Sequence, residues 1–249
     1  MESNRKTNNI NHSVSVDCVV FGFDGFSLKV LLVQRDLRDN LDIGDDTLVL
    51  PGDLIYIDED LEDAASRVLL DLTGIDNLFL EQIGAFGSLN RLAKDKDKVW
   101  LDLVRPIPES RVITIGYFAL VNIKNYTIRP AGFAKHVIWE DFNEVGELGF
   151  DHNDILRTAI IKLRNKLYHE PVGFKLLPKY FPLNHLYTLY NTILNSKLDR
   201  RNFLRRILKT GFLKETDNFQ EGVPHKPARL YKFIEKEFEN DNNHKFKFY

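Results

Sequence analysis

Residues 50–75 decide the fold, and they read LPGDLIYIDEDLEDAASRVLLDLTGI. A tight Pro-Gly loop leads into one amphipathic helix. Asp60 can cap that helix, and Asp63 completes a box-like N-terminus near the positive end of the helix dipole. Gly74 supplies a left-handed stop. Apolar side chains recur with the 3.6-residue period of an α-helix: Leu61, Ala64, Ala65, Val68, Leu69 and Leu72.

This order of loop, helix and glycine resembles the Nudix signature. The signature runs Gly, five residues, Glu, seven residues, Arg-Glu, an aliphatic residue, any residue, Glu-Glu, and Gly two residues later. Four residues fall on its positions: Glu59, Arg67, Leu69 and Gly74. The resemblance implies the α/β fold of that family, an α/β/α sandwich.

Two of the three carboxylates that the signature places on the helix are missing. Val68 replaces the Glu after Arg, Leu72 replaces the last Glu, and only Asp71 remains, while Asp53 stands where the pattern has its first Gly. Nudix hydrolysis relies on divalent cations, which need oxygen ligands. Residues four apart share a helical face, so Val68 and Leu72 together present hydrocarbon, rather than oxygen ligands, to a cation. We therefore expect a degenerate domain with no metal, no cofactor and no hydrolase activity.

Composition bounds the class of protein. A chain of 249 residues can form one large domain or two ordinary ones. Hydrophobic residues (43%) and charged residues (28%) are at the level of a soluble globular protein. The single Cys18 lies in an apolar run and predicts a small buried side chain rather than a disulfide or metal cluster. Residues 1–12 are polar and predict a disordered N-terminus without a signal peptide. No apolar run is long enough to span a membrane, so a cytoplasmic location without a membrane partner is expected.

Charge divides the chain into two parts. Residues 1–169 hold 19 Lys and Arg against 27 Asp and Glu, whereas residues 170–249 hold 15 against 9. An acidic front and a basic back indicate two modules with different partners. The asymmetry alone is weak support for nucleic-acid binding.

The first module, residues 13–168, is expected to be mainly strands around the helix. Residues 14–23 and 28–34 predict a hairpin, and a charged loop over residues 36–46 leads to a short strand at 47–50. Later elements are strands at 78–84, 111–122 and 134–139 and a helix at 150–168. Residues 90–110 are read as a polar loop, whose alternating Lys and Asp residues face solvent and whose residues 100–104 tether it. A Pro-rich linker is placed at residues 169–182.

Residues 183–240 have the element order of a winged helix-turn-helix. A helix over residues 184–194 has Asn184 as its cap, and Asp199 caps a basic helix over residues 200–210 that Gly211 ends. Two strands follow, at 212–216 and 228–233. The predicted buried stripe of the basic helix is Phe203, Leu204, Ile207 and Leu208.

The basic helix has the chemistry of DNA recognition. Arginine can grip guanine with a planar fork, asparagine can pair with adenine, and both lysine and arginine neutralise phosphates. The alternative to DNA binding is that the basic residues form a solvent-exposed face of an ordinary core helix. Cations in the wing position favour DNA binding over this alternative. The candidate DNA-binding residues are Arg200, Arg201, Asn202, Arg205, Arg206, Lys209, Lys226 and Arg229.

The two modules together resemble the Nudix-related transcriptional regulators, which join a Nudix-like effector domain to a winged helix. The stretches that carry the resemblance are residues 82–87, 150–152, 174–178, 198–203 (LDRRNF) and 227–233 (PARLYKF). The resemblance implies a ligand-responsive regulator that binds an operator in double-stranded DNA as a homodimer, because dimers of such domains read two half-sites. Residues 90–110 depart from the family, whose corresponding loop is shorter.

Two branches of that family differ in effector. One answers to ADP-ribose and governs NAD metabolism, and the other answers to sugars, notably arabinose. Residues 67–74, with their lost acids, look closer to the sugar branch. The expected effector is therefore a sugar such as L-arabinose, which needs hydrogen-bonding side chains and a stacking surface but no metal.

By analogy with the Nudix ligand cleft, the candidate effector-binding residues are Arg35, Asp53, Glu59 and Glu81. Each also has an ordinary structural explanation; Glu59, for example, can pair with Arg67 to hold the loop against the helix. His136 and His152 are interpreted as structural histidines. Three alternatives stay open: a Nudix hydrolase acting on ADP-ribose or a nucleotide sugar, an ADP-ribose-responsive regulator, and an interaction module whose basic face meets an acidic partner.

Overall fold

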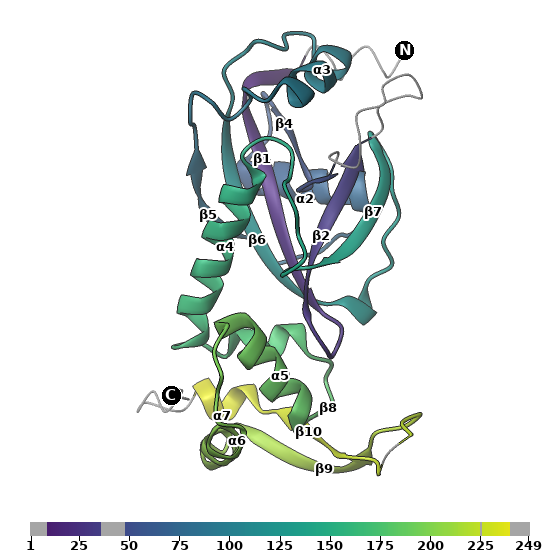
Figure 1. Ribbon diagram of the computed structural model, residues 1–249, viewed down its shortest axis with the longest axis vertical. Helices are drawn as coiled ribbons and strands as arrows, with labels where there is room; N and C mark the ends of the chain where they lie inside the picture. The colour runs from purple at the N-terminus through teal and green to yellow at the C-terminus, as the bar shows by residue number, and fades with distance from the viewer. Residues whose placement is uncertain (1–8, 36–47, 225, 240–249) are drawn as a thin grey trace. The chain divides into compact units, whose positions relative to one another are not determined.

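The computed structural model describes residues 9–35, 48–224 and 226–239 (Figure 1). The chain divides into two compact units. The first unit comprises Met1–Phe21, Lys29–Ala119 and Tyr126–Ala159, and the second comprises Gly22–Leu28, Leu120–Asn125 and Ile160–Tyr249. Both mix helices with strands, so the α/β class is confirmed.

A seven-stranded sheet forms the first unit, with the path β3-β2-β1-β6-β5, to which β4 adds on β1 and β7 on β2. The predicted strands are present, although their ends differ. The first begins at Ile10, so residues 10–12 are not disordered; the predicted loop at residues 36–46 lies outside the described residues. The strands are β1 Ile10–Phe23, β2 Leu28–Arg35, β3 Leu48–Val49, β4 Gly52–Tyr56, β5 Glu81–Phe86, β6 Ile113–Asn122 and β7 Ala134–Asp141.

Helix α2 (Leu61–Thr73) is the helix of the Nudix-like stretch, and it packs against β4 and β7. Gly74 ends it in the left-handed region (φ 73°), with its N–H donating to Leu70 O at 3.0 Å. Asp60 is the N-cap residue, but its side chain makes no capping hydrogen bond, so the predicted box is wrong. Helix α4 (His152–Leu167) packs on the sheet where Ile155 meets Gly116 of β6. Figure 1 shows α2 behind the sheet and α4 in front of it.

The segment between β5 and β6 corrects the predicted solvated loop. It contains the helix α3 (Asp95–Val104). Asp97, Trp100 and Leu101 are buried, so one side of this helix belongs to the core rather than to solvent. The alternating Lys and Asp residues hide this buried side from a reading of the sequence. The buried carboxylate among them is Asp97, and its partner Arg35 lies far away in the sequence.

The second unit is built around a three-stranded sheet of order β8-β10-β9. Its elements are η2 Pro171–Leu176, β8 Phe181–Pro182, α5 Leu183–Leu194, α6 Arg200–Lys209, β9 Leu213–Phe219, β10 Arg229–Phe233 and α7 Glu235–Glu239; the short η1 Ile123–Asn125 lies earlier in the chain. The N-cap of α5 is Pro182, not Asn184. The stretch predicted as a linker forms η2 and β8, and it buries Val172, Leu176 and Phe181. Helix, basic helix and hairpin follow in the order of a winged helix.

The core of the first unit is aliphatic and aromatic, and the single cysteine lies within it. Cys18 is fully buried on β1, as predicted from its apolar surroundings. Among the described residues, no helix is both long enough and apolar enough to cross a bilayer.

Candidate nucleic-acid interface and polar cavity

The start of α6 is fixed by one side chain. Asp199 Oδ1 accepts a hydrogen bond from the backbone N–H of Asn202 at 2.7 Å, which confirms the predicted cap. Phe203 and Ile207 are buried, and the Phe203 ring packs against Tyr190 of α5 at 5.4 Å between centroids. Leu208 is 43% exposed, so the predicted buried stripe is narrower than expected.

Every predicted cation of α6 is exposed. Arg205 donates a hydrogen bond to Asn202 Oδ1 at 2.9 Å, and the Arg200 guanidinium lies 6.0 Å from the centre of the Tyr187 ring. Exposed cations outside the packing stripe are what a recognition helix needs to contact DNA. The exposed residues are Arg200, Arg201, Asn202, Arg205, Arg206 and Lys209.

The hairpin of β9 and β10 occupies the wing position. Lys226 is exposed in its loop. Arg229 is exposed as well, but it forms an ion pair with Glu215 on β9 and lies over the Phe219 ring at 5.2 Å. Its charge is therefore partly compensated within the wing.

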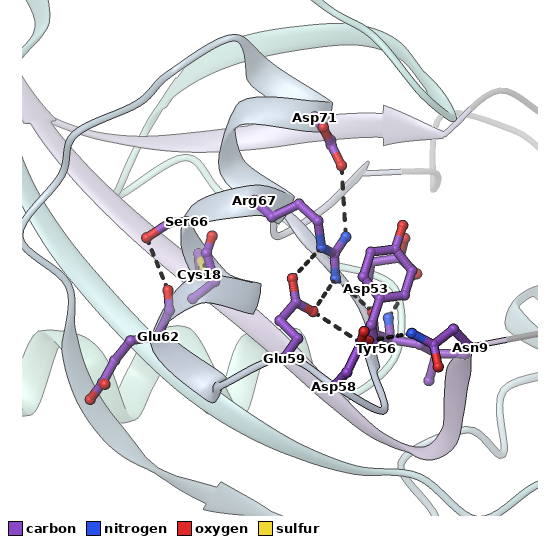
Figure 2. A network of polar contacts seen from close by, with 12 residues as sticks. Asn9, Cys18, Asp53, Tyr56, Asp58, Glu59, Glu62, Ser66, Arg67 and Asp71 are labelled. Carbon is purple, nitrogen blue, oxygen red and sulfur yellow. Dashed lines mark hydrogen bonds and ion pairs between the residues drawn. The ribbon is translucent and has the colours of Figure 1, made fainter. Parts of the chain in front are cut away.

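Arg67 is the centre of a polar network at the start of α2 (Figure 2). Its Nε and one terminal nitrogen donate to the two oxygens of Glu59 at 2.6 and 2.9 Å, and that nitrogen also donates to Leu54 O at 3.1 Å. Its guanidinium lies 4.1 Å from the centre of the Tyr56 ring. Burial raises the pKa of Glu59, but the hydrogen bonds and charge of Arg67 and the hydrogen bond from the Tyr56 N–H together lower that pKa. The predicted loop-holding pair is thus confirmed, and Glu59 is committed to it.

The residues of the Nudix-like helix do not fit a metal cluster. Val68 and Leu72 are buried against the fold, and Asp71 lies 3.7 Å from Arg67 on the exposed side. Within the described part of the chain, no group of three or more His, Cys, Asp or Glu side chains is arranged to hold a metal ion. The residues described on this helix therefore do not form a site for a catalytic metal ion.

A second polar cluster lies inside the first unit. Asp17 of β1 contacts the Arg91 guanidinium at 3.2 Å and His152 Nε2 at 3.3 Å, and His152 Nδ1 accepts the Leu50 N–H at 2.8 Å. Burial raises the pKa of Asp17, but His152 and Arg91 outweigh burial and hold that pKa far below its ordinary range. Both nitrogens of His152 have partners, which confirms its structural role, whereas His136 is exposed.

These residues line a polar cavity of about 20 Å³, together with Asp53, Trp100 and Arg105. Burial lowers the pKa of the Arg105 guanidinium, although Asp53 and Asp17 act in the opposite direction. Among the four predicted effector residues, only Asp53 lines this cavity. Glu59 is held by Arg67, and Glu81 pairs in register with Phe118 on β5 and β6. The structure therefore does not assemble the predicted set.

Arg35 is committed to holding α3. Its guanidinium donates to Asp97 Oδ1 at 2.9 Å and lies about 5 Å from the Trp100 and Phe150 rings (5.1 and 5.2 Å). Asp97 Oδ2 accepts the Phe150 N–H at 2.6 Å. Sequence reasoning missed Arg91, Asp97 and Arg105, because no local pattern distinguishes these buried charges from solvated ones.

Comparisons with known proteins agree with both units. Residues 173–233 match the family model described as the NrtR DNA-binding winged helix domain. The ADPR responsive transcriptional repressor NtrR of Acinetobacter baylyi is 30% identical over 230 residues, which cover 91% of this chain and 84% of the relative. The chain belongs to this NrtR family of transcriptional regulators. Its Nudix-like domain and winged helix are therefore those of a Nudix-related regulator.

Solved structures support the same architecture for this NrtR-family chain. Shewanella oneidensis NrtR is 26% identical with a TM-score of 0.64, over 89% of this chain and 94% of that one. Its complex with a 27mer DNA is 25% identical with a TM-score of 0.64, over 91% and 95%. A MutT/nudix family protein from Enterococcus faecalis, 22% identical with a TM-score of 0.63 over 90% and 87%, shares the fold.

The family assignment corrects the predicted effector branch. The sequence favours the sugar branch because α2 has lost its acids, whereas the Acinetobacter relative is named as ADPR responsive and no comparison supports an arabinose regulator. Val68 and Leu72 remove a metal site, but a sensor of any ligand can lack one. The loss of these acids therefore carries no information about which molecule is sensed.

Proposed function

We propose that this NrtR-family protein is a transcriptional repressor that binds an operator in double-stranded DNA and responds to ADP-ribose. The observation that carries the DNA part is the exposed arginine face of α6, fixed by the Asp199 cap within the matched residues 173–233. The effector part is supported by a relative named as ADPR responsive that aligns with 91% of the chain.

The proposed division of labour follows from the side chains. Arg201 and Arg205 lie four residues apart on the exposed face of α6, so both can reach one groove. Arginine forks suit guanine edges and phosphates. Arg229 is held by Glu215, so we expect it to contribute less than the helix arginines. Binding of ADP-ribose in the first unit then lowers the affinity for DNA, which is the linkage that a repressor of this kind requires.

The test begins with selection of an operator from random duplexes, followed by fluorescence anisotropy. The variants Arg201→Ala and Arg205→Ala are each expected to weaken binding at least about tenfold, because a good arginine contact contributes about 1–3 kcal/mol. Arg157→Ala, which removes an exposed arginine paired with Asp154 on α4, is the matched control. Unchanged DNA affinity in folded Arg201→Ala and Arg205→Ala variants contradicts the DNA-binding role of α6.

The effector arm uses the selected duplex with ADP-ribose, NAD, L-arabinose and other pentoses. ADP-ribose is expected to release the DNA without added magnesium, and the pentoses are expected to leave the complex intact. Release by NAD alone overturns the effector assignment. Magnesium-dependent formation of AMP from ADP-ribose favours the hydrolase alternative.

A further inference from the structure

The polar cavity of the first unit has hydrogen-bond donors without acceptors. Arg91 Nε, Trp100 Nε1 and one terminal nitrogen of Arg105 are buried and have no hydrogen-bond partner among the described residues. All three residues line the cavity, and Arg91 and Trp100 are 6% and 5% exposed. Buried donors in folded proteins almost always have partners. These three donors can therefore receive hydrogen-bond acceptors of a bound group.

Arg105 is a cation at this cavity that keeps a buried donor without an acceptor. Asp17 pairs with Arg91 and contacts His152 Nε2, and Arg91 also lies 3.4 Å from Asp151. Asp53 lies beside Arg105, but its Oδ1 accepts the Leu54 N–H at 2.7 Å. Within the described residues, Arg105 makes no hydrogen bond with the terminal nitrogen that is buried here. Arg105 and Arg91 thus each keep one buried donor without an acceptor in this cavity. Phosphate oxygens are acceptors that a guanidinium binds well.

A second, larger cavity shares part of its lining with the polar cavity. About 20 Å³ holds little more than one water molecule. A larger cavity of about 500 Å³ shares Arg91 and Leu92 with it and is walled by residues 88–112. That volume lies in the range of small-molecule sites. A ligand in the larger cavity can therefore contact Arg91, which lines both cavities.

We propose that the segment between β5 and β6 carries the recognition site for the phosphate oxygens of the effector, with Arg105 as the principal ligand-binding cation and Trp100 as a second donor. The ligand class is a molecule with a phosphate or diphosphate group. The proposal rests on the proposed function in that ADP-ribose has such a group and neutral pentoses do not.

The experiment is isothermal titration calorimetry of the full-length protein with ADP-ribose and, separately, inorganic pyrophosphate. Arg105→Gln is expected to weaken both ligands about 10- to 100-fold, since a hydrogen bond to a charged group contributes about 1.5–3 kcal/mol. Arg105→Lys restores part of the affinity, because it keeps the charge and loses the fork. Arg157→Gln, the same change at an exposed site on α4, retains wild-type affinity. Unfolding in urea shows that each variant is folded.

The outcomes separate this site from the proposed function. Wild-type affinity for both ligands in Arg105→Gln overturns the site and means that water satisfies these donors, while release of DNA by ADP-ribose still supports the function. Pyrophosphate binding that depends on Arg105, without ADP-ribose binding, supports the site and overturns the effector. Binding of neither ligand by the wild type overturns both. If Arg105→Gln does not fold, Trp100→Phe keeps the ring and removes the N–H; a severalfold loss supports the site, and unchanged affinity contradicts it.

Discussion

Arg67 keeps its place in the signature although two of the three acids on its helix are replaced. Its hydrogen bonds to Glu59 and Leu54 O, with its contact to the Tyr56 ring, join the loop to α2. These contacts stabilise the fold and need no metal. The pair of Glu59 and Arg67 could be predicted from the sequence because both partners are within one signature. The arrangement explains how the signature's spacing can persist where Val68 and Leu72 replace two of its acids.

Restoring an acid to the helix tests this view. Leu72 is buried, so Leu72→Glu places a carboxylate among apolar side chains, and the free energy of unfolding is expected to fall by about 3 kcal/mol or more. Leu70→Glu is the matched control, because Leu70 is 49% exposed on the same helix; its effect is expected within about 1 kcal/mol. Urea denaturation measures both. Equal stability of the two variants contradicts the buried position of Leu72.

Asp17 makes folding depend on pH. Its pKa in the folded protein lies well below the ordinary value of 3.8. As pH falls below about 4 the unfolded chain takes up this proton first, so the free energy of unfolding falls with pH. Asp17→Asn is expected to lower stability at neutral pH and to make the decline between about pH 4 and pH 2.5 shallower. Urea midpoints across this range measure it, and the exposed Asp154→Asn is the control. A decline as steep as that of the wild type contradicts the prediction.

At the scale of elements, α6 could be predicted and α3 could not. The cap Asp199, the apolar spacing and Gly211 are all local, and local signals decide where a helix such as α6 begins and ends. In α3 the deciding contact joins Asp97 to Arg35, which are 62 positions apart. Sequence periodicity cannot reveal such a pair. Linkers are subject to the same limit, since β8 exists through its pairing with β10.

Asp97→Ala tests whether that pair holds α3. Its removal leaves Arg35 buried without a carboxylate and frees the Phe150 N–H, so the free energy of unfolding is expected to fall by about 3–5 kcal/mol. Faster amide exchange is expected in residues 95–104. Asp95→Ala is the control two positions away, because its side chain is 98% exposed; its effect is expected within about 0.5 kcal/mol. Similar exchange in both variants contradicts the assignment.

For the whole molecule, fold class and family follow from the sequence, and the effector does not. Strand order, a signature-like helix and a basic winged helix suffice to place the architecture. The identity of a bound ligand depends on side chains that converge from distant segments, such as β1, α3 and the start of α4 around the polar cavity. The predicted effector-binding set therefore rests on analogy alone: Arg35, Asp53, Glu59 and Glu81. Of these four residues, only Asp53 lines that cavity.

The predicted homodimer remains to be measured. Two winged helices per assembly are expected to read two half-sites, so the complex with the selected duplex should hold two chains. Native mass spectrometry is expected to give twice the 29.0 kDa chain mass without DNA and two chains per duplex with it. The wing variant Lys226→Ala is expected to weaken DNA binding without changing this stoichiometry. One chain per duplex contradicts the dimer.

Modification of the Cys18 thiol reports how often the core of the first unit opens. It is the only cysteine among 249 residues, it is fully buried on β1, and burial raises the pKa of its thiol. Because the thiolate is the reactive form, a thiol reagent can modify the native chain only when the sheet opens. The colour released by such a reagent therefore records how often this core opens, without any engineered label. A ligand that binds the native unit lowers the rate of Cys18 modification in proportion to its occupancy.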